Sequence, residues 1–421
     1  MKLFFYSLGL FITLVFTSNP ITLSFGFKLI PIFYNSFFII LFFNKKILNK
    51  VSTSLIFLIC LQLIGVLRNN SPNSTIIYNL YLFISQIIFC FYIFSFNYYM
   101  IKKEIGFTKL INYNIIIPLT LFGILNYILL ALKINDSSSL EIGDAILIKQ
   151  IFNIDITRVT FPLVSGAVNF GFIIGITIIS TILIWHDLSK LFKFIYGVNL
   201  LFLMYLLLIN DSRATIFTML LLLIINYFPF LKIKNLFFKF IPILSVFGPL
   251  IFILISLTIV NLGLDEYISR NKNDFLTGNS RFIIWLAVLD DIVKFEYWQI
   301  FGLGDFGSYS SGVSEAWAGL FLAFDEPLLT TTHNVAFNIF YDLGYIGVFF
   351  YVYNISKVFF NPIQSKNTNI PKLLLAFFVI QGITDVPFGF YTFQNNCIFY
   401  LIFIVFFYVK NEDIFSTNKS V

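Results

Sequence analysis

Long apolar segments, each bounded by a short polar stretch, recur along almost the whole chain. Most approach the roughly 20 residues that an α-helix needs to cross a hydrocarbon layer about 30 Å thick, and none alternates like a barrel strand. The pattern predicts an all-α polytopic integral membrane protein with about twelve transmembrane helices. We expect them at residues 3–17, 22–43, 54–67, 76–100, 114–132, 161–184, 194–210, 213–230, 237–262, 333–354, 371–388 and 393–409. The first and third are short, and whether they cross fully stays open.

The composition supports this class of protein. Hydrophobic residues make up 58% of the 421 residues and charged residues 11%, with a mean hydropathy of +0.89. Soluble domains are roughly 45–50% apolar and about 25% charged, so a soluble enzyme, a disordered chain and a disulfide scaffold are excluded. The three cysteines, Cys60, Cys90 and Cys397, all lie in apolar segments. We expect them to be small buried hydrophobic residues without a disulfide.

The polar connections alternate between lysine-rich and lysine-poor. One set, with both termini, holds 17 of the 27 basic residues and four of the 21 acidic ones, a net charge of +13 against −7 for the rest. The positive-inside rule places this set and both termini in the cytoplasm. Two long connections, 133–159 and 261–332, then lie on the opposite face. The second contains an amphipathic helix that begins near Asn279-Ser280-Arg281, and we expect this helix to lie on the outer membrane surface.

These expectations divide the chain into four parts. Residues 1–132 are N-terminal transmembrane helices, and residues 133–260 are central transmembrane helices with the first periplasmic loop. Residues 261–332 are a long periplasmic loop with surface helices, and residues 333–421 are C-terminal transmembrane helices and a cytoplasmic tail. The sequence shows no internal repeat of the kind that many transporters contain.

The five arginines follow a different rule from the lysines, because all lie outside the predicted spans or at their outer ends. Arginine presents a planar fork of donors that matches phosphate oxygens, and charges near membrane depth are usually functional. Arg158, Arg213 and Arg281 together would suit a diphosphate on a lipid carrier. The alternative is that they extend to the interface or pair with acidic residues such as Asp211. Arg68 and Arg270 lie in polar loops, where we expect them to be solvated.

One histidine lies on the same face as the arginines. His333 stands beside Asn334 where the long loop enters a predicted helix, and a neutral imidazole there could take a proton from a sugar hydroxyl. The alternative is a structural histidine that hydrogen-bonds the loop to the helix. His186, at the opposite face, is interpreted as an interface residue.

Two further motifs are given a structural interpretation. Residues 302–307 match G-x-G-x-x-G but follow no predicted strand, so a turn-rich loop is expected instead of a dinucleotide site. The acidic pairs at 265–266 and 290–291 have no histidine or third carboxylate at supporting spacing, which favours solvated acids over a metal site. We therefore expect no metal and no other cofactor, and the charge pattern gives no support for nucleic-acid binding.

The order of these motifs resembles that of the O-antigen ligase/polymerase superfamily of bacterial envelope glycosyltransferases. The matching parts lie within about residues 155–350: Arg158 to Asn169, Asn210 to Thr215, Asn279 to Arg281 with Trp285, the glycines at 302–307, Thr332 to Asn334, and Gly344 to Gly347. The chain departs from the family pattern in having no proline just before Asn169 and in having Ala214 at a position that is usually glycine.

The resemblance implies a GT-C-like membrane glycosyltransferase of the bacterial inner membrane with a periplasmic active site. Such enzymes take a glycan from undecaprenyl diphosphate with inversion and without a metal. By position, Arg158, Arg213 and Arg281 would hold the diphosphate, and His333 would activate the acceptor. Asn169, Ser212, Trp285 and Asn334 would be supporting residues.

Three functions remain open at this point. The first is an O-antigen or polysaccharide polymerase, which transfers the glycan to a lipid-linked repeat unit, with membrane lipid and a chain-length regulator protein as further partners. The second is an O-antigen ligase, whose acceptor glycolipid is lipid A-core. The third is a flippase or transporter of the lipid-linked oligosaccharide.

Overall fold

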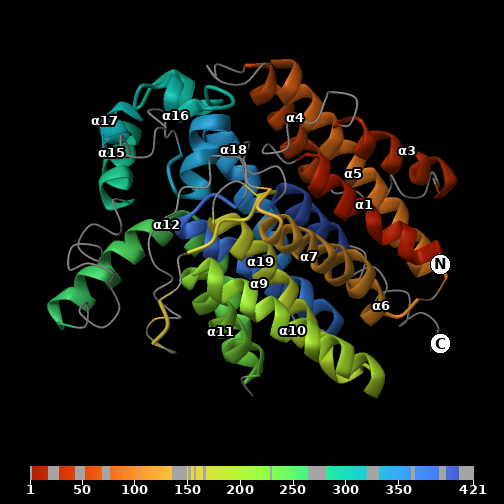
Figure 1. Ribbon diagram of the computed structural model, residues 1–421. Coiled ribbons are helices and arrows are strands. Elements are labelled where there is room, and N and C mark those ends of the chain that lie inside the picture. The colour runs from red at the N-terminus through yellow and green to blue at the C-terminus, as the bar shows by residue number, and fades with distance from the viewer. Residues whose placement is uncertain are drawn as a thin grey trace.

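The computed structural model describes residues 2–17, 28–42, 53–68, 76–103, 105–134, 149, 153–155, 158–164, 167–227, 230–263, 281–319, 331–361, 366–387 and 395–406. These residues form helices and short connections, and no strand occurs among them (Figure 1). The prediction of an all-α fold is therefore confirmed for the described part of the chain.

The N-terminal third contains α1 (Lys2–Phe16), α3 (Ile30–Phe42), α4 (Thr53–Leu67), α5 (Ile76–Lys102), α6 (Phe107–Ile111) and α7 (Ile117–Ala131), with a π-helical turn (Asn112–Ile116) between the last two. The centre contains α9 (Ala167–Ile184), α10 (Lys190–Asn210), α11 (Arg213–Tyr227) and α12 (Leu231–Asn261). Then follow α15 (Arg281–Val293), α16 (Gly307–Ser310), α17 (Glu315–Ala318), α18 (Val335–Phe359), α19 (Lys366–Thr384) and a last helix, Asn395–Phe406.

The expected number of membrane-spanning helices needs correction. Among the described residues, six helices are long and apolar enough to cross a membrane: Ile76–Met100, Phe107–Ala131, Val168–Asp187, Lys190–Asn210, Leu231–Asn261 and Val335–Phe359. The other six expected segments form apolar helices of 10–17 residues within the described residues. At 1.5 Å per residue, a 15-residue helix measures only about 22 Å, so the count of twelve was wrong by this criterion.

Two of the shorter helices end before the apolar segment that predicted them does. α19 ends at Thr384, just before Asp385 and Pro387, and α11 ends at Tyr227, two residues before Pro229. Val386, the residue before Pro387, is non-helical, as is typical of a residue that precedes a proline. The long apolar helices still indicate a multi-pass membrane protein.

α9 is the central helix of the bundle. About 78% of its most apolar stretch is buried, against 22% for α12, which lies at the periphery. α9 packs against α10, α11 and α19, and α19 packs in turn against α12 and α18 (Figure 1). The core is rich in phenylalanine: Phe172 of α9 meets Phe377 and Phe378 of α19 at ring-centroid distances of 5.4 and 4.3 Å.

The surface of the bundle carries many large apolar side chains. Phe194 and Leu201 of α10 and Phe217 of α11 are among the most exposed of them. A water-soluble monomer rarely exposes so much apolar area, whereas a lipid-facing helix requires it. Of the cysteines, Cys90 and Cys397 are buried as expected, but Cys60 lies on an exposed face of α4, and all three are free thiols.

The amphipathic helix expected after Asn279 is α15, although Asn279 and Ser280 lie outside the described residues. Its apolar face, which includes Phe282, Trp285 and Val288, is buried against the protein itself, so the expectation that this face lies on the membrane surface was wrong. Trp285 meets Phe252 of α12 at 5.9 Å between ring centroids. Packing on the bundle fixes α15 above one end of α12 and α18.

The glycine motif at 302–307 forms a turn that wraps around α18, as the interpretation as a loop predicts. The amides of Leu303 and Gly304 donate to the carbonyls of Tyr341 and Asp342 at 2.8 and 3.0 Å. There α18 is kinked at Gly344, whose φ is +69°. A Cβ on Gly344 would lie 2.4 Å from the Ile300 carbonyl, so only glycine allows both the kink and the close approach of the two backbones.

Candidate functional site

The junction between α10 and α11 positions Arg213. Asp211 ends α10 in the left-handed conformation at φ +51°, and its carboxylate, with the side chain fully buried, lies 3.7 Å from Arg213 Nε. Ser212 donates from its hydroxyl to the Asn210 side-chain oxygen at 2.9 Å. α9 approaches this turn so closely that a Cβ on Gly171 would lie 2.0 Å from Ser212 Oγ. The local chemistry therefore fixes where α11 begins.

Arg158 is held at the same junction. Its Nε donates to the carbonyl oxygen of Asn210 at 2.9 Å. Val159 donates from its amide to the Ile209 carbonyl, and the Asn210 side chain donates back to the Val159 carbonyl. These three bonds attach the segment before α9 to the end of α10. Arg158 and Arg213, 55 positions apart in sequence, thus meet at one end of the bundle.

Asn334 has a structural role that the sequence only partly indicates. Its fully buried side chain caps α18 by accepting from the Phe337 amide at 3.0 Å. The same side chain donates to the carbonyls of Gly382 and Ile383 at 3.1 Å each. One amide group therefore starts α18 and joins it to the end of α19, and replacement would leave buried partners unpaired.

Trp285 fixes the other side of this loop-to-helix junction. Its indole, which is fully buried, donates from Nε1 to the Thr332 carbonyl at 3.1 Å. His333 follows in the left-handed region at φ +50°, which few non-glycine residues adopt. Its side chain is about 20% exposed, so the surrounding residues orient the imidazole while part of the ring stays accessible from outside the protein.

Asp385 connects two residues of the predicted site and was missed in the sequence. One carboxylate oxygen lies 3.6 Å from His333 Nδ1, and the other accepts from Arg281 Nη2 at 3.5 Å. The Asp385 side chain is 19% exposed and the Arg281 side chain 21%. An acidic residue inside the expected span 371–388 was the available signal, because an ionisable residue at membrane depth usually has a function.

α19 also connects the two halves of the site. Gln381 donates from Nε2 to the Ala214 carbonyl and to the Thr218 hydroxyl, both at 2.8 Å. Asp385 lies one turn further along, with its amide bonded to the Gln381 carbonyl. Two parts of the site therefore lie at the same end of α19. One is the start of α11 with Arg213, and the other is Arg281 and His333, which both lie beside Asp385.

Asn169 lies near the same end, on the first turn of α9, and accepts from the Asn395 side chain at 2.8 Å. Arg68 lies elsewhere and donates to the Gly302 carbonyl at 3.1 Å, while Arg270 is outside the described residues. His186 follows the opposite end of α9, about 25 Å along the helix from Asn169. The structure thus separates His186 and Arg68 from the predicted site.

The arrangement gathers three guanidinium groups and one imidazole at one end of the bundle, a set of side chains whose chemistry suits anions. Arg213 lies beside Asp211 and Arg281 beside Asp385, while the Arg158 guanidinium donates to a backbone carbonyl, so three cationic groups stand against two carboxylates at this end. Within the described residues, no group of three or more His, Cys, Asp or Glu side chains could hold a metal ion. Comparisons with known proteins add no relative: no family model, no curated protein and no solved structure matches the chain.

Proposed function

We propose that the protein is a glycan polymerase that transfers a glycan from undecaprenyl diphosphate to the next lipid-linked repeat unit. The observation that carries the proposal is the meeting of Arg281, His333 and Asp385, which come from three separate segments. Arg158 and Arg213 lie at the same end of the bundle. A diphosphate leaving group and an acceptor hydroxyl need this combination of cationic forks and a base.

The proposed reaction is a direct displacement with inversion. The acceptor hydroxyl oxygen attacks the anomeric carbon while the bond from that carbon to the diphosphate oxygen breaks. The diphosphate leaves with the electron pair, and the arginines compensate the charge that develops on it. The hydroxyl proton passes to His333. One Asp385 oxygen lies 3.6 Å from Nδ1, close enough for the carboxylate to stabilise the imidazolium charge that forms when His333 takes up this proton.

The proposed orientation places this end of the bundle in the periplasm and both termini in the cytoplasm. α10 begins at Lys190 and ends beside Arg213, and α18 begins beside His333 and carries Lys357 in its last turn. The arginine–histidine end and the lysine end are therefore opposite ends of the same helices, as the positive-inside rule requires.

Cysteine labelling tests this orientation. In a chain without the three native cysteines, Ser310→Cys in α16 should react with a membrane-impermeant thiol reagent on intact spheroplasts. A cysteine in place of Lys190 should react only after lysis and is the matched control. Labelling in the reverse pattern would place the site in the cytoplasm and contradict the proposal.

The acceptor separates the polymerase from the ligase, since both use the same donor. Deletion of the gene should leave lipopolysaccharide capped with a single repeat unit if the protein is a polymerase. Uncapped core together with accumulated lipid-linked polymer would identify a ligase instead. Purified protein that moves labelled lipid across liposomes but never lengthens the glycan would identify a transporter.

A further inference from the structure

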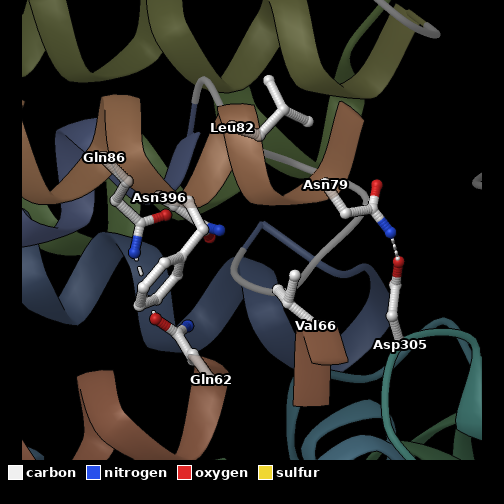
Figure 2. A pocket seen from close by; sticks show the side chains of 8 residues that line it. Gln62, Val66, Asn79, Leu82, Gln86, Asp305 and Asn396 are labelled. Carbon is white, nitrogen blue, oxygen red and sulfur yellow. Dashed lines mark hydrogen bonds between the residues drawn. The ribbon is translucent and has the colours of Figure 1, made fainter. Parts of the chain in front are cut away.

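A small polar cavity lies away from the arginine–histidine site, between α4, α5, the turn before α16 and the last helix. Its volume is about 30 Å³. Figure 2 shows the polar side chains that line it: Gln62 from α4, Asn79 and Gln86 from α5, Asp305 from the turn, and Asn396 from the last helix. Five polar side chains around so small a space in an apolar bundle need a physical explanation.

Asp305 is the residue that makes this cavity unusual. Its side chain is 2% exposed, Asn79 donates to its Oδ2, and its amide donates to the Gly65 carbonyl at 3.1 Å. Its Oδ1 has no hydrogen-bond partner among the described residues. Burial raises the pKa of this carboxyl to about 7, although the bond from Asn79 and an interaction with the Phe306 amide oppose the shift. Near neutral pH, a negative charge therefore forms in the wall of the cavity.

No basic side chain neutralises that charge within the described part of the chain. The Arg68 side chain is exposed, and its Nη1 is bonded to the Gly302 carbonyl. The neighbouring carboxyl, Asp342, is 3% exposed, and its two oxygens accept from the Gly307 amide and the Asn338 side chain. An unpaired buried carboxylate is costly, so a counter-charge from outside the protein would stabilise it.

We propose that the cavity is a binding site for a monovalent hard cation, with sodium as the ion that fits, held by Asp305 and the surrounding side-chain amides. Carboxylate and amide oxygens are the ligands that hard cations prefer. One carboxylate with one open oxygen balances a single charge, which favours a monovalent ion over a divalent one. A water-sized particle needs about 10–15 Å³, so 30 Å³ holds one sodium ion and a single water.

The ion would connect three parts of the chain. Gln62 accepts from Gln86 at 3.0 Å and from Tyr400 of the last helix at 2.8 Å, which joins α4, α5 and that helix. Asp305 adds the turn that wraps the kink of α18. Bound sodium is therefore expected to stabilise the packing of the N-terminal helices on this turn. The inference does not depend on the proposed glycan transfer.

Thermal unfolding of the purified protein in detergent tests the site. At pH 8 and constant ionic strength, sodium chloride should raise Tm by about 2–4 °C over choline chloride. Asp305→Asn should abolish this difference. Val66→Leu, which adds a methylene group to the cavity wall and keeps the carboxyl, should abolish it as well. Asp290→Asn is the matched control, because Asp290 is an exposed acid paired with Lys294 and should leave the sodium effect intact.

Equilibrium dialysis with radioactive sodium measures the binding directly. If Asp305→Asn does not fold, Val66→Leu still tests the proposal. About one sodium ion per protein in the wild type, and none in Val66→Leu, is the expected result. Equal Tm in sodium and choline would overturn the proposal, as would a sodium effect that persists in both variants. A stability that depends on pH alone, and is lost in Asp305→Asn, would mean that a proton neutralises the carboxyl.

Discussion

Replacement of Asp385 by asparagine is the most informative perturbation of the proposed active site. The substitution keeps the size of the side chain and removes the charge that lies 3.5 Å from Arg281 and 3.6 Å from His333. At an effective dielectric constant near 20, two unit charges at this separation interact by about 5 kcal/mol. The side chains are about one-fifth exposed and the contacts are long, which reduces the expected contribution to about 1.5–3 kcal/mol.

In the proposed reaction the Asp385 charge stabilises the imidazolium that forms as His333 takes up the proton, and this free energy sets the expected change in rate. Because about 1.4 kcal/mol corresponds to a factor of ten, transfer in Asp385→Asn should fall by about 10- to 150-fold. Donor binding should be retained, since Arg281 keeps its charge and loses a competing carboxylate. The effect should therefore appear in kcat and not in the donor Kd.

The assay uses purified protein with a lipid-diphosphate donor, and it measures glycan transfer and donor binding separately. Asp385→Glu, which keeps the charge, should recover part of the rate. Asp290→Asn, at an exposed ion pair on α15, is the matched control and should transfer at the wild-type rate. Transfer by Asp385→Asn within twofold of wild type, at equal protein levels, would refute the role of Asp385 in positioning His333.

Three further predictions follow from the same geometry. Arg213→Lys and Arg281→Lys keep the charge but lose the planar fork of donors. Each should weaken donor binding by about 10-fold or more in a lipid-diphosphate binding assay. Full activity in both variants would mean that the two arginines serve only in packing. His333→Ala should lower transfer by about 10²–10⁴-fold while the folded protein still binds donor, and loss of folding and binding together would favour a structural histidine. Gly171→Ala places a Cβ 2.0 Å from Ser212 Oγ and should lower the free energy of unfolding by about 1–3 kcal/mol. Denaturant titration measures this change. An unchanged midpoint would mean that the junction between α10 and α11 rearranges at little cost to accept the methyl group.

The sequence alone determined the class of fold and several local features. Composition and apolar segments are enough to predict a helical membrane protein, because the cost of unpaired backbone groups in lipid leaves few alternatives. The start of α18 after His333-Asn334 and the turn at 302–307 were also predictable. Each depends on residues close together in the chain, where capping and turn chemistry act.

The tertiary structure decided which residues share a site. Asp385 lies 52 positions after His333 and 104 after Arg281, and no periodicity reports a contact between segments so far apart. The contact exists because the Asn334 side chain binds the end of α19 while Trp285 holds Thr332. The number of long helices was equally hard to predict, because hydropathy measures how apolar a segment is and does not report where its helix ends: α12 continues through Pro242 and Pro249, whereas α19 ends just before Asp385.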